Sequence, residues 1–401
     1  MIKPLKILFI CNKSPWPPKE GGPIAMNQLI EGLADAGHEI KVLAINTNKY
    51  SVDTNDIPEE YKNKTSIELE YVNLAVKPIP AFLNLFTNKS YHVQRFSSKA
   101  VAKRLISLLQ HQEFDIVQIE TLFMSPYVND IRKYSKAKVV LRAHNIEHLI
   151  WKRVAKNYSN PLKRFYVSHL ADTLEVYEKN IIDDYDGIVP ITSEDAKFFK
   201  AHCDKPIFPL PFGVEADRIK IDKSLKPELA LFHIGSMNWI PNEEGIRWFV
   251  DEVWPLVESN LGELKLYLAG REMPEWIYNL NKKNIIVIGE VDDAHDFIRS
   301  KAISIAPLFS GSGIRIKIIE SMALAKAVVS TEIGAEGINV ESGKNIFIAN
   351  TANDFFESIM TLVNNKVLLN EMGDNARKFV EENHSTKKLI HDLVGFYRQI
   401  L

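Results

Sequence analysis

Short apolar runs alternate with longer amphipathic segments along the whole chain. The runs are rich in Leu, Ile and Val and have few polar interruptions, as expected of strands buried on both faces of a parallel sheet. The segments between them are long enough for crossover helices, so the alternation predicts an α/β fold. The ten runs are KILFIC (6–11), IKVLAI (40–45), FDIVQI (114–119), KVVLRA (138–143), GIVPIT (187–192), LALFHIG (229–235), LKLYLAG (264–270), NIIVIG (284–289), AISIAPL (302–308) and KAVVST (326–331).

The strand pattern runs twice, which indicates two α/β halves. The first series ends near Pro211–Val214, a polar stretch follows, and a new run begins at Leu229. We therefore expect a domain boundary within residues 213–228. The last segment, residues 385–401, has the periodicity of an amphipathic helix.

Length, charge and cysteine content agree with this division and limit the possible partners. At roughly 150 residues per domain, the 401 residues favour two or three domains. The 49 Lys and Arg against 51 Asp and Glu give a net charge of -2, which argues against a nucleic-acid binder. Two cysteines, Cys11 and Cys203, cannot form a disulfide framework or a four-thiolate zinc site. No stretch reaches the roughly 18 apolar residues of a spanning helix, and Leu5–Cys11 is too short for a signal-peptide core, so we expect a cytoplasmic protein.

Two phosphate-binding motifs are absent and a third motif is ambiguous. After Cys11 the chain reads NKSPWPPKEGGP, without the G-x-G-x-x-G of a dinucleotide-binding turn, and no segment satisfies G-x-x-x-x-G-K-[ST]. The segment His144–His148 matches the H-x-x-E-H motif of inverted zinc peptidases. His144 follows a predicted strand directly instead of lying within a helix, so a zinc hydrolase is the less favoured alternative.

The strongest chemical signal is the segment 305–323, IAPLFSGSGIRIKIIESMA. An apolar run ends at a glycine-rich turn and a helix follows, so backbone N–H groups and the helix dipole would form an anion site. Arg315 and Lys317 add two cations at the helix end where the dipole disfavours them, which a bound diphosphate would explain. The alternative is a glycine-rich loop with a surface pair between Lys317 and Glu320.

This segment resembles the donor-site signature of the family 4 retaining glycosyltransferases (glycosyl transferases group 1), which have the GT-B fold. Glu320 matches the glutamate that holds the donor ribose hydroxyls in that family. Ser312 stands where the family has a first glutamate, which is a departure from the signature. The resemblance implies that the turn 311–313 lies near the donor sugar and that Arg315 and Lys317 balance the diphosphate charge.

Other positions agree with the resemblance along most of the chain. Residues 20–23 resemble the glycine loop that faces the donor phosphates, and residues 142–145 resemble the segment that carries the family's cleft histidine. Residues 235–236 resemble the start of the second domain, and residues 289–291 the loop near the donor base. The donor-binding set implied in this way is Gly21, Gly22, Gly235, Ser236, Gly289, Glu290, Val291, Gly311, Ser312 and Gly313, and the catalytic set is His144, Arg315, Lys317 and Glu320.

The resemblance also implies an architecture and an activity. We expect two Rossmann-like parallel-sheet domains that face each other across a cleft. Residues 1–218 would form the acceptor-side domain, with helix 385–401 packing back on it, and residues 219–384 the nucleotide-sugar-binding domain. The implied reaction is a retaining transfer of a hexose from a UDP- or GDP-type sugar to a hydroxyl of a glycan, glycolipid or polysaccharide precursor, with no metal and no cofactor. Because Ser312 replaces a glutamate, a non-catalytic nucleotide-sugar-binding protein on the same fold is the alternative.

Two stretches of the first half combine aromatic side chains with cations. Residues 78–96 are aromatic and contain no acid, and residues 151–153 and 163–166 place Lys and Arg beside aromatic rings, as interfacial helices do. The sequence leaves two interpretations open: peripheral contact with the inner face of a membrane, and an ordinary amphipathic helix with solvated lysines.

Overall fold

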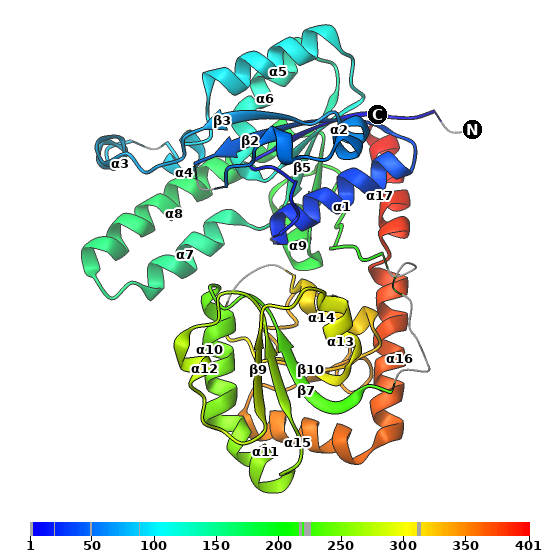
Figure 1. The fold of residues 1–401 in the computed structure, drawn as a ribbon. Coiled ribbons are helices and arrows are strands. Elements are labelled where there is room, and N and C mark those ends of the chain that lie inside the picture. The colour runs from blue at the N-terminus through cyan, green and yellow to red at the C-terminus, as the bar shows by residue number, and fades with distance from the viewer. Residues whose placement is uncertain are drawn as a thin grey trace. The chain divides into compact units, whose positions relative to one another are not determined.

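The computed structural model describes residues 3–19, 21–48, 50–87, 89–215, 219, 226–310 and 314–401. The chain divides into two compact units, which Figure 1 shows as separate groups of strands and helices. Unit 1 comprises Met1–Pro211 together with Thr386–Leu401, and unit 2 comprises Phe212–Ser385. The division falls just before the polar stretch 213–228, and the chain crosses between the units twice.

Unit 1 is built on a parallel six-stranded sheet with the strand order β3-β2-β1-β4-β5-β6. The register places Lys6 of β1 opposite Glu39 of β2, and Cys11 of β1 opposite Glu120 of β4. Chain order reverses between β1 and β4, which lie side by side although two strands separate them in the sequence. The strands are β1 Lys6–Cys11, β2 Glu39–Thr47, β3 Glu68–Val72, β4 Ile116–Glu120, β5 Lys138–Ala143 and β6 Gly187–Pro190.

Helices cover both faces of this sheet because side chains on β1 alternate between two cores. Leu8 and Ile10 belong to one core, together with Leu105 of α5. Ile7 and Phe9 belong to the other core, which contains the apolar faces of α1 and α17. The helices of unit 1 are α1 Gly21–Asp35, α2 Glu59–Thr65, α3 Pro78–Asn84, α4 Tyr91–Gln94, α5 Lys99–His111, α6 Val128–Tyr134, α7 Glu147–Asn157, α8 Pro161–Ile181, α9 Ser193–His202 and α17 Thr386–Ile400, with 3-10 turns at Thr54–Asp56, Leu122–Tyr127 and Ile182–Asp184.

The C-terminal helix α17 is an integral part of unit 1. Its Leu393 and Tyr397 are completely buried. It packs so closely on α1 that a Cβ at Gly32 would come within 2.8 Å of the Ile390 side chain. At Gly187, where β6 begins, a Cβ would come equally close to the Phe396 ring, at 2.8 Å. Small residues at both contacts allow the helix to reach the sheet.

Unit 2 repeats the architecture with the strand order β12-β11-β10-β7-β8-β9, again parallel, and chain order reverses between β7 and β10. Phe249 and Phe355 are buried in its core and stack edge to face. The strands are β7 Glu228–Ile234, β8 Leu266–Ala269, β9 Ile285–Gly289, β10 Lys301–Ala306, β11 Ala327–Ser330 and β12 Phe347–Ile348. The helices are α10 Ile240–Trp248, α11 Trp254–Asn260, α12 Glu275–Tyr278, α13 Ala294–Arg299, α14 Ile316–Ala323, α15 Ala352–Asn364 and α16 Lys366–Asn383, with a π-helical turn at Phe249–Val253.

Each of the ten apolar runs corresponds to a strand, so the predicted α/β fold with two parallel sheets is confirmed. The runs did not predict β3 and β12, each of which lies at one edge of its sheet. β3 reads ELEYV and only its last residue is buried, while β12 spans two half-buried residues. An edge strand has one partner and does not need an apolar run. Within the described residues, no helix is long and apolar enough to cross a membrane.

Candidate active site

The strand order of each sheet marks where a ligand would bind. In open parallel sheets, ligands occupy the crevice beyond the carboxyl ends of the strands, at the point where chain order reverses. In unit 1 this point lies beyond β1 and β4, which end at Cys11 and Glu120. In unit 2 it lies beyond β7 and β10, which end at Ile234 and Ala306. These two edges are where the predicted site residues should lie.

In unit 1, His144 forms a close pair with a buried carboxylate. His144 lies between the end of β5 and the start of α7, and its Nε2 is 2.6 Å from Oε2 of Glu120 at the end of β4. The Glu120 side chain is fully buried and that of His144 is 11% exposed. Burial alone would raise the pKa of Glu120, but the hydrogen bond from His144 and the charge of Arg142 oppose it and hold this pKa below its ordinary value. Glu120 is therefore an anion that fixes the ring of His144.

A buried hydrogen-bond chain holds Glu120 from the other side. Nε2 of Gln118 donates to Oε1 of Glu120 at 2.5 Å. Oε1 of Gln118 in turn accepts the hydroxyl hydrogen of Tyr397, which lies on α17. The chain thus runs from the C-terminal helix through Gln118 and Glu120 to His144. Sequence analysis missed Glu120 and Gln118; the available signal was two polar residues at the carboxyl end of an otherwise apolar strand.

The two histidines of the H-x-x-E-H segment do not point to a common site. His144 pairs with Glu120, whereas Nδ1 of His148 lies 2.6 Å from Oε2 of Glu178 on α8. Glu178 also accepts the backbone N–H groups of Glu147 and His148, at 3.1 and 3.2 Å, and so caps the start of α7. The two histidines serve different carboxylates, and no group of three or more His, Cys, Asp or Glu suited to a metal occurs in the described part of the chain. His148 and Glu178 instead join α7 to α8.

Glu147 makes the folding stability of the protein depend on pH. Burial, reinforced by the charge of Glu178, raises the pKa of Glu147 to about 8. The unfolded chain releases this proton near the ordinary value, so stability should fall as pH rises from about 4.5 to about 8. We expect Glu147→Gln to flatten that fall and to raise the melting temperature at pH 8 more than at pH 5. Thermal unfolding at both pH values measures this, and an unchanged pH dependence in the variant would contradict it.

In unit 2, glycines line the carboxyl edge of the sheet beside the switch point. A Cβ at Gly270, after β8, would lie 1.8 Å from the carbonyl oxygen of Gly235, so these two strand ends meet backbone to backbone. The N–H of Gly270 donates to the carbonyl of Gly289, which ends β9 with a φ of +79°. Glu290 is exposed and Val291 half-buried in the loop that follows. The predicted residues 235–236 and 289–291 therefore share one edge.

Lys317 lies at this edge in a polar cluster. Its Nζ donates to Oδ1 of Asn242 at 2.6 Å and lies 3.4 Å from Nε2 of His233. Nδ1 of His233 donates to the carbonyl of Ile305 at 3.0 Å, which leaves Nε2 as the acceptor that faces Lys317. Burial and then the charge of Arg315 lower the pKa of Lys317 to about 7. A bound anion would restore the charge on this amine.

Two further predicted residues lie on or next to α14. Arg315 directly precedes the helix, is buried, and places its guanidinium over the Trp239 ring, 5.2 Å from the centroid. Glu320 pairs with His295 of α13, with 3.8 Å between Oε1 and Nε2. The hydrogen bond to Glu320 raises the pKa of His295. The alternative of a Lys317–Glu320 surface pair is therefore wrong, because each residue has a different partner.

The remaining predicted residues are less informative. Gly21 and Gly22 begin α1, and a Cβ at Gly22 would lie 3.3 Å from the side chain of Lys13, which follows β1. Ser236 donates to Oδ1 of Asn238 and its carbonyl accepts from Asn242. Glu20 and the turn Gly311, Ser312 and Gly313 lie outside the described residues. Sequence analysis did not predict His233 and His295, which are strand and helix residues without a motif.

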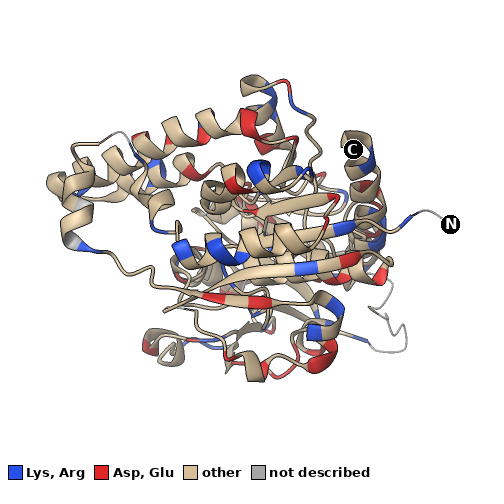
Figure 2. Cartoon of the chain, turned by 90° about the horizontal axis from the view of Figure 1, so that it is seen from above, with Lys and Arg blue, Asp and Glu red and all other residues tan. Residues whose placement is uncertain are grey.

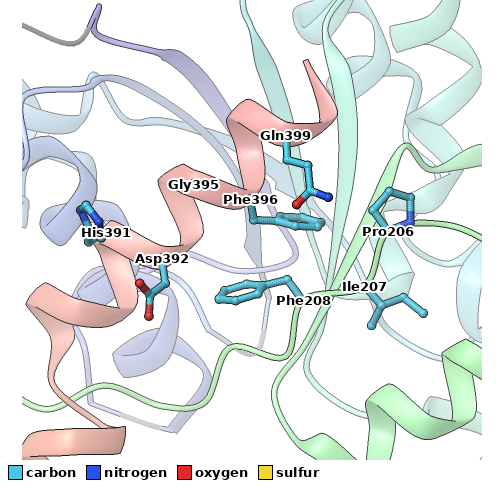
Figure 3. Close-up of a pocket in the computed structure, with 8 residues that line it drawn as sticks. All are labelled: Pro206, Ile207, Phe208, His391, Asp392, Gly395, Phe396 and Gln399. Atoms are coloured by element: carbon cyan, nitrogen blue, oxygen red, sulfur yellow. The ribbon is translucent and has the colours of Figure 1, made fainter.

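One cavity of unit 1 lies away from these edges. It measures about 430 Å³ and opens between α17 and the segment 206–208. Phe208 and Phe396 stack within it, and Figure 3 shows them beside Pro206 and Gln399. None of the predicted site residues lines it. The cavity is therefore not part of the candidate site.

Comparison with known proteins gives independent evidence. Residues 228–365 match the family model described as Glycosyl transferases group 1. An uncharacterized 44.6 kDa protein in the cps region of Klebsiella pneumoniae is 23% identical over 400 residues, covering 97% of this chain and 98% of that protein. The uncharacterized glycosyltransferase MJ1069 of Methanocaldococcus jannaschii is 23% identical over 393 residues, covering 92% of this chain and 91% of that protein.

Solved structures agree on the architecture. Sucrose-phosphate synthase from Thermosynechococcus elongatus superimposes with a TM-score of 0.69 at 14% identity, covering 98% of this chain and 99% of that one. HepE of Anabaena, in complex with UDP, superimposes with a TM-score of 0.68 at 10% identity, covering 98% of this chain and 100% of that one. At such identities the likeness shows the fold, and the fold is that of GT-B glycosyltransferases. The match over residues 228–365, the relatives and the fold support the recognition that residues 305–323 suggested: the chain has the GT-B fold, and its second half is similar to the group 1 glycosyltransferases.

Proposed function

We propose that this glycosyltransferase moves a hexose from a UDP- or GDP-type sugar to a hydroxyl of a glycan, glycolipid or polysaccharide precursor, with retention at the anomeric carbon and without a metal ion. The observation that carries the proposal is the cationic cluster at the switch point of the second sheet. Lys317, fixed by Asn242 and next to Arg315, lies at the carboxyl edge of this sheet, where open parallel sheets bind their ligands. Two neighbouring cations at this edge favour an anionic ligand there.

In this reaction the cationic cluster would stabilise the leaving group, the nucleoside diphosphate. The bond between the anomeric carbon and the diphosphate oxygen breaks, and a new bond forms to the acceptor oxygen. The acceptor proton leaves with the departing diphosphate. Negative charge grows on the diphosphate in the transition state, and fixed cations in a partly buried site stabilise it without reorganisation. We assign that role to Lys317 and Arg315 and propose that no metal ion shares it.

The other residues receive supporting roles. We assign Glu320 to the ribose hydroxyls of the donor, a role that a half-exposed carboxylate can perform by accepting two hydrogen bonds. We assign His144 to the hexose hydroxyls, because Glu120 holds its ring in one orientation. HepE, with which this chain shares its fold, was solved with UDP, which supports a uridine donor. The cps-region relative supports a surface-polysaccharide acceptor.

A panel of UDP- and GDP-sugars tests the proposal. We expect one donor to stabilise the enzyme thermally, and to release nucleoside diphosphate faster when an acceptor glycan is added, in the presence of EDTA. Arg315→Ala and Glu320→Ala should each lower this turnover at least about tenfold, because each removes a donor contact. Binding without release would favour the non-catalytic alternative. An inverted product, identified from the anomeric NMR signal, would contradict retention.

A further inference from the structure

One end of unit 1 exposes large apolar side chains that nothing in the unit covers. On and around α3, Ile79, Phe82 and Phe86 are 73%, 61% and 76% exposed. At the first turn of α8, Leu162 and Phe165 are 79% and 68% exposed. Exposed apolar groups scattered singly are ordinary, but a group of this size marks an interaction site. We call this set the apolar end.

The two parts of the apolar end belong to one surface. Leu162, Phe165 and His169 recur at the three- and four-residue spacing that places them on one face of α8. His169 Nε2 lies 3.2 Å from the carbonyl oxygen of Asn84, the last residue of α3. Tyr91 of α4 packs against Tyr166 and Leu170 of the same helix. Figure 1 accordingly shows α3 and the junction of α7 with α8 at the same end of the unit, on the left of the view.

Cations surround this surface and acids are missing from it. Residues 148–171 contain five Lys or Arg and no Asp or Glu, and residues 71–112 contain no acid either. Figure 2 shows both charge signs over most of the chain, so this stretch is a local departure. Arg153, Lys156 and Lys163 are exposed, and none of them forms an ion pair with any residue that the structure describes. Their charge is therefore available to an external partner.

We propose that the apolar end docks unit 1 on the surface of an anionic lipid bilayer. Aromatic and aliphatic groups flanked by Lys and Arg fit the boundary between headgroups and acyl chains, where apolar burial and attraction to anionic lipid act together. A protein partner of mixed charge would leave the acid-free rim unmatched. The attachment is peripheral and does not depend on the donor site, because the docking residues lie on α3 and α8 and the donor-site cations on α14.

Vesicle flotation tests this proposal. The full chain is mixed with vesicles of phosphatidylcholine alone, or of phosphatidylcholine with phosphatidylglycerol, at low and at high salt. We expect the chain to bind the anionic vesicles at low salt. Its binding should be at least about tenfold weaker at high salt, and at least about tenfold weaker on neutral vesicles. Leu162→Ser with Phe165→Ser, and separately Lys163→Glu with Arg164→Glu, should each lower the partition coefficient at least about tenfold.

Matched controls separate this surface from general effects. Lys282→Glu with Lys283→Glu reverses an adjacent exposed pair in unit 2, and Val367→Ser removes an apolar group that is 67% exposed on α16. Both should bind vesicles like the parent. Thermal unfolding and turnover with a water-soluble acceptor, which should not change, verify the fold of every variant. The proposal is overturned if the parent ignores anionic vesicles at low salt, if controls and test variants lose binding alike, or if the parent self-associates through Leu162 and Phe165 instead.

Discussion

Replacement of Lys317 by Ala is expected to lower kcat/KM for the sugar donor by about a hundredfold, the loss typical of a single preorganised group that stabilises charge in a transition state. The amine is fixed by Asn242 and partly buried, so water cannot replace it at full strength. Lys326→Ala is the matched control. Lys326 is also buried, with a pKa lowered to about 8, but its Nζ donates to the carbonyl of Arg299. Turnover per folded molecule should be preserved in that variant.

The pH dependence makes the same prediction sharper. The pKa of Lys317 in the free enzyme is lowered to about 7, and the charged amine is the form that attracts a diphosphate. The value of kcat/KM should therefore fall as pH rises above about 7. In Lys317→Arg the guanidinium keeps its charge throughout this pH range. The activity that this variant retains should therefore show no fall of kcat/KM above about pH 7. A fall of the same size in Lys317→Arg, or near-normal turnover in Lys317→Ala, would remove Lys317 from the mechanism.

Glu120→Gln is expected to lower turnover by about ten- to a hundredfold while the chain still folds. The amide has the shape of the carboxylate but no charge, so it orients the ring of His144 less firmly. The low pKa of Glu120 also means that the ionised group stabilises the fold above its ordinary pKa, and that this contribution is lost as pH falls. The variant should therefore be less stable than the parent at neutral pH and closer to it in acid.

The chain offers a control of the same chemistry. Glu178 is also a buried carboxylate bonded to a histidine, but it caps α7 and faces no predicted substrate group. Glu178→Gln should reduce thermal stability, yet turnover measured well below its melting temperature should match the parent. Equal losses of activity in both variants would show that Glu120 acts only through stability. Unchanged activity in Glu120→Gln would exclude the pair with His144 from catalysis.

The fold was predictable from sequence because parallel strands are buried on both faces. Ten apolar runs therefore stand out, and each one is a strand. The edge strand β3 escaped because solvent reaches it, and ELEYV lacks an apolar run. One of its polar residues binds a neighbouring helix, because Glu68 forms a hydrogen-bonded ion pair with Arg104 on α5. Local sequence does not reveal a partner that is so distant along the chain.

The candidate site was predictable only where a motif carries it. Arg315, Lys317 and Glu320 stand in one contiguous block, so a resemblance could identify them together. The partners that give them their properties come from elsewhere: Asn242 lies 75 residues before Lys317, and His295 lies on another helix. The Lys317–Glu320 spacing suggested a helical surface pair, but the lysine turns to Asn242. Tertiary contacts outweighed the few tenths of a kcal/mol that such a pair provides.

The return of α17 to unit 1 has a consequence for how the protein is made. The first 211 residues emerge from the ribosome without the helix that covers one face of their sheet. All of unit 2 must be synthesised before Tyr397 can reach Gln118 and complete the hydrogen bonds behind Glu120. Nascent unit 1 therefore carries an open apolar face while unit 2 is being synthesised, a period when chaperones can recognise it. A premature stop codon that removes only the last helix would leave unit 2 whole and disable the histidine of unit 1.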